Sequence, residues 1–208
     1  MARQIAALYV QERGCYIGLE GVDPWPVERD ARLYAGPHPV VAHPPCSRWC
    51  QLAALVEARW GHKRGDDGGC FASALASVRT YGGVLEHPAF SKAWPAFNLS
   101  APPASGGWVR GFCGGWVCQV DQSQYGHKAR KSTWLYAFGT DLPPLLWGRK
   151  NGTHWVGHMA RRGDGTACIG PGMRLGARAA ASTPPEFRDL LISIARSAKP
   201  RSFSGMGG

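Results

Sequence analysis

The stretch from residue 40 to residue 88 constrains the fold of this chain more than any other part. It holds the apolar run VVAH at 40–43, an Ala-rich segment at 68–81 and a second apolar run, VLEHP, at 84–88. Apolar residues in the middle segment stand at positions 71, 74, 75 and 78, a spacing that predicts a helix, and a Gly-Gly turn follows it. Strand, helix and strand in this order predict a βαβ unit, and hence an α/β fold on a mostly parallel, Rossmann-like sheet.

Further elements are expected on both sides of this unit. Apolar runs predict strands at 5–10, near 22, at 116–120 and at 133–138, whereas four prolines exclude a regular helix through most of 24–39. A last helix should begin near Thr183, whose spacing from Glu186 fits a capping box with Pro184 at the first helical position. We expect a single domain over 1–199, with 139–180 a small irregular insertion and 200–208 a disordered tail.

Composition limits the class of partner. The 208 residues are 44% hydrophobic, enough for one buried core, and the formal net charge is +10. Such a surplus favours a polyanionic partner, nucleic acid first and an anionic membrane second. No apolar run approaches the roughly 18 residues of a membrane span, and the first residues lack the pattern of a signal peptide, so we expect a cytoplasmic protein.

The cysteines indicate free thiols. Seven of them stand at positions 15, 46, 50, 70, 113, 118 and 168, and no two have the CxxC spacing of structural zinc sites. An odd count without such pairs predicts reduced cysteines and disfavours zinc.

Two residues stand where α/β enzymes place their chemistry. Cys46 follows the strand at 40–43 and the Pro-Pro pair, and Glu86 ends the apolar run at 84–86. Cys46 is a candidate nucleophile, although free cysteine is often a small buried hydrophobic residue. Glu86 is a candidate general acid or a solvated turn residue, and the neighbouring His87 either assists or packs, with packing favoured.

In order along the chain, several motifs resemble the DNA cytosine-5 methyltransferase family over roughly residues 30–196. They are the Pro-Cys after a strand in AHPPCSRW, the glutamate in VLEHP, the Tyr-Gly and basic loop in QYGHKARKSTWLYAFG, and the helix start in STPPEFRDLL. The resemblance implies that Cys46 attacks C6 of cytosine, that Glu86 contacts N3 and the exocyclic amine, and that Arg130 assists. It also implies DNA as substrate, a flipped-out base and S-adenosylmethionine as methyl donor. Compact basic chains of this kind resemble phage or prophage modification proteins, which act in the cytoplasm of a bacterial host.

The resemblance extends to binding residues. Asp23, Asp30 and Trp25 become candidates for the donor's ribose and adenine, although each aspartate equally suits a turn cap. Phosphate contacts are expected from a separate basic set: Lys128, Lys131 and Arg48.

Departures from the family pattern leave two other interpretations open. The loop after the first strand, LYVQERGCY, lacks the glycines that receive the methyl donor in the family, and the register of the basic loop is ambiguous between Arg130 and Lys131. A relative without the methyl donor, acting at C5 or on a mononucleotide, would retain the pyrimidine pocket. A catalytically inactive DNA-binding or inhibitory protein would need neither Cys46 nor Glu86.

Overall fold

The computed structural model describes residues 3–51, 53–156, 160–161, 167–168 and 173–199. These residues form an α/β fold around a seven-stranded sheet with the strand order β2-β1-β3-β4-β7-β6-β5. The strands are β1 Ile5–Leu8, β2 Val22–Trp25, β3 Val40–Ala42, β4 Gly83–Pro88, β5 Val109–Arg110, β6 Trp116–Asp121 and β7 Ser132–Phe138. The strands predicted from the apolar runs are confirmed.

The sheet has a parallel half and an antiparallel half. β2, β1, β3 and β4 run parallel to one another, whereas β7 is antiparallel to β4, β6 to β7 and β5 to β6. The expectation of a mostly parallel sheet therefore holds only for the first half. Residues 122–131 join β6 to β7, and this connection is too short for the crossover that a parallel pair needs.

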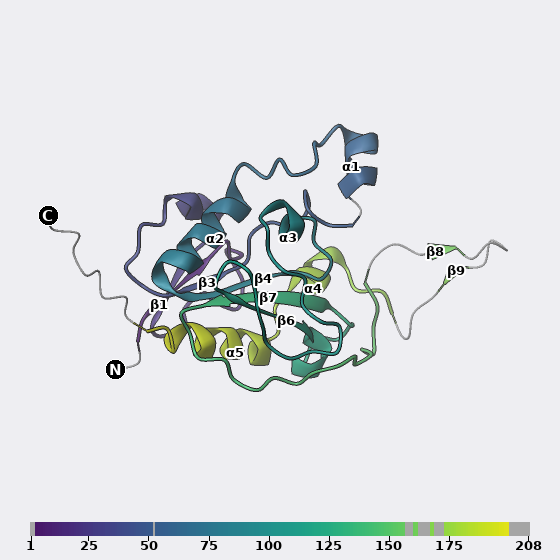
Figure 1. Cartoon of the computed structure of the whole chain (residues 1–208). Coiled ribbons are helices and arrows are strands. Elements are labelled where there is room, and N and C mark those ends of the chain that lie inside the picture. The colour runs from purple at the N-terminus through teal and green to yellow at the C-terminus, as the bar shows by residue number, and fades with distance from the viewer. Residues whose placement is uncertain (1–2, 52, 157–159, 162–166, 169–172, 200–208) are drawn as a thin grey trace, which may run out of the picture.

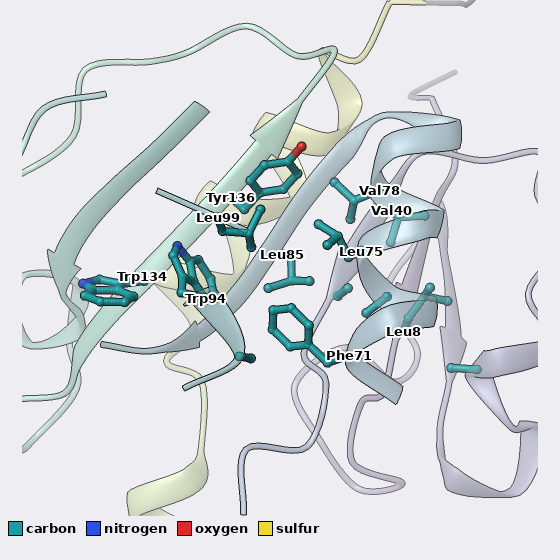
Figure 2. Close-up of a cluster of buried hydrophobic side chains, with 14 of the residues drawn as sticks. Leu8, Val40, Phe71, Leu75, Val78, Leu85, Trp94, Leu99, Trp134 and Tyr136 are labelled. Atoms are coloured by element: carbon teal, nitrogen blue, oxygen red, sulfur yellow. The ribbon is translucent and has the colours of Figure 1, made fainter. Parts of the chain in front are cut away.

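Helices cover both faces of the sheet, and Figure 1 shows α2 (Cys70–Tyr81) and α5 (Pro185–Arg196) on opposite sides of it. The helix predicted at 68–81 is α2, which buries Phe71, Leu75 and Val78 against the sheet (Figure 2). Across the sheet, α5 buries Phe187, Leu191 and Ile194 in a second cluster. Side chains of the parallel strands alternate between these two clusters, as the two-residue period of a strand requires.

The start of α5 differs from the expected capping box. The helix begins at Pro185, its N-cap is Pro184 in an extended conformation, and no side chain caps it. A residue that precedes proline is held away from helical geometry, so the second proline moves the start of the helix past Pro184 and leaves Thr183 outside the cap.

The remaining elements are short. They are the 3₁₀ turns η1 Val27–Arg29, η2 Ala31–Leu33 and η3 Gln122–Tyr125, the helices α1 Ala53–Trp60, α3 Ala93–Ala96 and α4 Ala177–Ala181, and the pair β8 Ala160–Arg161 and β9 Ala167–Cys168. The sequence did not predict α1, α3 or β5. The expected tail at 200–208 lies outside the described residues. None of the described helices is long and apolar enough to cross a bilayer.

Candidate functional site

Glu86 is the centre of a buried polar row at the carboxyl end of β3 and β4. The two strands pair in parallel with Ala42 beside Leu85, so the next residues, His43 and Glu86, point to the same face of the sheet. The Nδ1 atom of His43 lies 3.0 Å from Oε2 of Glu86. On the other ring nitrogen, Nε2 lies 2.9 Å from the hydroxyl of Tyr16, which follows β1.

The second oxygen of Glu86 is held from the antiparallel half. Gln122, at the end of β6, donates from Nε2 to Oε1 of Glu86 at 2.9 Å and to the hydroxyl of Thr133 in β7, also at 2.9 Å. Gln122 and Thr133 have no exposed surface. Both carboxylate oxygens thus receive a hydrogen bond inside the protein, which fixes the orientation of Glu86.

Glu86 is ionised at neutral pH. Its burial by itself raises the pKa, but the hydrogen bond from His43 and the positive charge of Lys131 outweigh burial and lower the pKa to about 2. A carboxylate in this state accepts hydrogen bonds and does not donate a proton. The expected role of Glu86 as general acid therefore needs a proton from a neighbouring group.

Cys46 lies close enough to this carboxylate for the charge of Glu86 to act on its thiol. The Pro-Pro pair ends β3, and the carbonyl of Cys46 then accepts hydrogen bonds from the backbone amides of Trp49 and Cys50, each at 2.9 Å, which turns the chain back. Burial of the half-exposed thiol raises its pKa, and the negative charge of Glu86 raises it further. Cys46 is therefore a thiol rather than a thiolate at neutral pH.

Lys131 is a cation that acts electrostatically on Glu86 and Cys46. Its charge lowers the pKa of both Glu86 and Cys46, and its Nζ lies 3.3 Å from the carbonyls of Ala181 and Ser182. Arg130 is held elsewhere, because its Nε donates to the buried carboxylate of Asp121 at 2.7 Å. The structure thus pairs Arg130 with Asp121, whereas the charge of Lys131 acts on Glu86 and Cys46.

The other basic candidates lie at the surface around this end of the sheet. Arg48 lines a cavity of about 490 Å³, whose lining includes three more cations, Lys63, Arg64 and Lys92. Arg64 is paired with Glu57, which also lines the cavity. Lys128 is exposed, and its carbonyl accepts from the amide of residue 154.

The candidates for donor binding are engaged with neighbouring arginines. Asp23 accepts from the indole of Trp25 at 2.8 Å and pairs with Arg29, whose guanidinium lies 4.0 Å from the centre of the Trp25 ring. Asp30 pairs with Arg32 and also accepts from its backbone amide, so it serves as a turn cap. As they stand, these residues do not fit S-adenosylmethionine, because Arg29 covers both the carboxylate and a face of the indole.

Two neighbours of the candidate residues have packing roles. The ring of His87 points to the opposite face from Glu86 and lies among aromatic rings, 5.2 Å from Phe71 and 6.2 Å from Trp94 between centres. Cys50 contacts the carbonyl of Ser47 and lines the basic cavity. Among the described residues, no three histidines, cysteines or acidic residues are placed to hold a metal ion.

Sequence reasoning named Cys46 and Glu86 as candidates but did not name the side chains that hold the glutamate. The position of His43 could have been read from the local sequence. It is a polar residue at the end of a buried strand, three residues before Cys46, so it lies at the same edge of the sheet as the candidate nucleophile. Tyr16, Gln122 and Thr133 had no such local signal, because each joins this group through a contact between segments distant in sequence: Gln122 with Glu86, Tyr16 with His43 and Thr133 with Gln122. Comparisons with protein-family models, with curated proteins and with solved structures find no match to this chain.

Proposed function

We propose that this protein modifies pyrimidine bases in DNA by adding the thiol of Cys46 to C6 of the ring, in the manner of DNA cytosine-5 methyltransferases. The observation that carries the proposal is a partly buried thiol that follows one parallel strand and feels the charge of a buried, ionised carboxylate in the adjacent parallel strand. Open α/β sheets bind their ligands at this edge. The parallel half of the sheet, with helices on both faces, supports a Rossmann-like methyltransferase arrangement.

The chemistry follows from the two groups. As the sulfur of Cys46 bonds to C6, its S–H bond breaks and a proton reaches the ring nitrogen N3, so that C5 becomes an enamine carbon that attacks electrophiles. The carboxylate of Glu86 accepts a hydrogen bond from the exocyclic amine of cytosine. Uracil presents a carbonyl oxygen at that position, which repels a carboxylate. The site therefore favours cytosine.

The positive charge of the protein supports DNA as the substrate. The chain carries a formal net charge of +10, and the cavity that Arg48 lines has four cations in its lining, of which one is paired with an acidic residue. Backbone phosphates bind such surfaces through salt-sensitive contacts. A base within a duplex reaches a buried thiol only when it is turned out of the stack.

Methyl transfer from S-adenosylmethionine is the form of this chemistry that the sequence resemblance implies. The contacts of Asp23 and Trp25 with Arg29 favour a second candidate, in which the same adduct forms without a methyl donor. We therefore derive no step through the donor. The two forms share the addition of Cys46 and differ only in the electrophile that C5 meets.

The test of the shared step needs no donor. Addition of a thiol to C6 lets the hydrogen on C5 exchange with water, so DNA that contains 5-tritiated cytosine should release tritium when the protein is added. We expect Cys46→Ala to abolish release while DNA binding persists, and Cys50→Ala to retain release. Equal loss in both variants, or no release by the native protein, would contradict the proposal.

A second arm identifies the electrophile. Fluorine at C5 cannot leave as a proton, so DNA with 5-fluorocytosine should form a denaturation-resistant adduct with the protein after a group has been transferred to C5. Adduct that forms only with S-adenosylmethionine supports methyl transfer. Adduct that forms equally without it supports the donor-independent reaction.

A further inference from the structure

His43 lies between two hydrogen-bonding partners in the interior of the protein. Its side chain is 13% exposed, with Nδ1 3.0 Å from Oε2 of Glu86 and Nε2 2.9 Å from the hydroxyl of Tyr16. The three groups come from three segments, after β1, after β3 and within β4. They form an unbroken line of hydrogen bonds that ends at the candidate catalytic carboxylate.

This line satisfies His43 in either protonation state. As an imidazolium, the ring donates from Nδ1 to Glu86 and from Nε2 to the oxygen of Tyr16. As a neutral ring, it donates from one nitrogen and accepts at the other, because a tyrosine hydroxyl serves as donor or acceptor. Burial raises the pKa of Tyr16 well above its ordinary value, so the hydroxyl keeps its proton in both states. A change of charge on His43 therefore leaves no buried polar atom of this line without a partner.

His87 lacks such an arrangement. It occupies the next position of the same strand as Glu86, but its ring packs against Phe71 and Trp94. Burial lowers the pKa of His87 to about 4, although the charge of Glu86 opposes the shift. Of these two histidines near Glu86, His43 is the one whose ring is hydrogen-bonded to the carboxylate.

We propose that His43 is a positioning residue that supplies Glu86 with the proton delivered to the base, an inference that rests on the proposed addition of Cys46 to a pyrimidine. In the transfer, the Nδ1–H bond of an imidazolium breaks and an O–H bond forms on Glu86, which leaves a neutral ring and a neutral carboxylic acid. Glu86 then protonates N3 and returns to the carboxylate. The thiol of Cys46 gives up its proton to solvent as the C–S bond forms, and the neutral ring of His43 takes a proton back from solvent, so that overall one proton leaves sulfur and one reaches N3.

Charged and titratable groups face the line from every element packed against it. Their charges act on every proton in the line, so any pH dependence of the reaction belongs to the whole cluster rather than to one ring. Among the described residues they are Cys15 after β1, Cys46 after β3, Lys131 before β7, and Arg188 and Asp189 in α5, and the charge of His87 acts on Glu86 from the opposite face of the sheet.

The first test measures the protonation state of His43 in the protein without DNA. Nitrogen-15 NMR of the histidine rings distinguishes an imidazolium from either neutral tautomer, and we expect the spectra recorded over the pH range in which the protein stays folded to show a His43 imidazolium. In Glu86→Gln the imidazolium should persist only to a lower pH, because its negative partner is gone. A single neutral tautomer of His43 across the whole range would overturn the inference, whether or not the protein acts on DNA.

The second test reads the consequence for the reaction. His43→Asn keeps an N–H that can reach Glu86 but carries no proton to release, so the maximal rate of tritium release should fall by roughly 10²- to 10⁴-fold at unchanged DNA affinity. Tyr16→Phe, which keeps the ring and removes one partner, should shift the pH profile of the rate. A full rate with an unchanged pH profile in folded His43→Asn would overturn the inference. Absence of tritium release from the native protein would contradict the proposed function alone, because the NMR result stands apart from it.

Discussion

Acid should destabilise this fold through His87 before it protonates the buried carboxylate. Burial of the ring lowers the pKa of His87 from 6.5 to about 4, so between these values the unfolded chain binds a proton that the folded chain excludes. The folded state therefore keeps its full stability with respect to His87 above pH 6.5 and loses stability as the pH falls toward 4. The free energy of unfolding should drop by about 2 to 3 kcal/mol between pH 7.5 and 4.5 from this residue alone, at ~1.4 kcal/mol per pKa unit. That is a large share of the roughly 5–15 kcal/mol that stabilises a typical domain.

Urea unfolding at the two pH values measures the loss, and His87→Phe isolates it. Phenylalanine keeps an aromatic ring beside Phe71 and Trp94 and has no proton to gain. We expect this variant to lose about 2 to 3 kcal/mol less stability than the native protein on acidification. The exposed His62 provides the control, because His62→Asn should leave the native pH dependence unchanged. Equal pH dependence in His87→Phe and the native protein would refute the assignment of the acid sensitivity to this ring.

Two further predictions concern the reactive groups. Glu86→Gln keeps the shape of the side chain but removes its charge and the proton it passes on, so tritium release should fall by roughly two to four orders of magnitude, and an unchanged rate would remove Glu86 from the mechanism. Lys131→Met should raise the pKa of Cys46, because the charge that lowers it is removed. The pH profile of alkylation of that thiol by iodoacetamide should then shift to higher pH. Arg130→Met should leave this profile unchanged, because Arg130 is paired with Asp121.

Local patterns predicted the elements that carry the two reactive residues. The helical spacing of α2 and the apolar runs of β3 and β4 are decided by neighbours in sequence, and they were confirmed. Those strands place Cys46 and Glu86 at one edge of the sheet. The proline pair that ends β3 acts locally as well, because proline has no amide to continue the strand.

What the sequence could not predict depends on pairing between distant segments. The choice between Arg130 and Lys131 depends on which of the two faces Asp121, and this is set by the pairing of β6 with β7. The direction of β7 is equally non-local, since an apolar run has the same appearance in parallel and antiparallel strands. The partners of Asp23 were hidden for a different reason: Arg29 reaches it through a tight turn that no periodic pattern marks.

The position of β4 explains how an ionised carboxylate persists in the core. β4 is the last parallel strand and the first to pair with the antiparallel half, so Glu86 receives one hydrogen bond from each half of the sheet: from His43 after β3 and from Gln122 after β6. Burial of a carboxylate with no partner would favour its neutral form. A strand at the edge of the sheet has a neighbour on one side only. The junction of the two halves is therefore the place in this fold where a buried glutamate is held from both sides while the adjacent turn presents Cys46 to it.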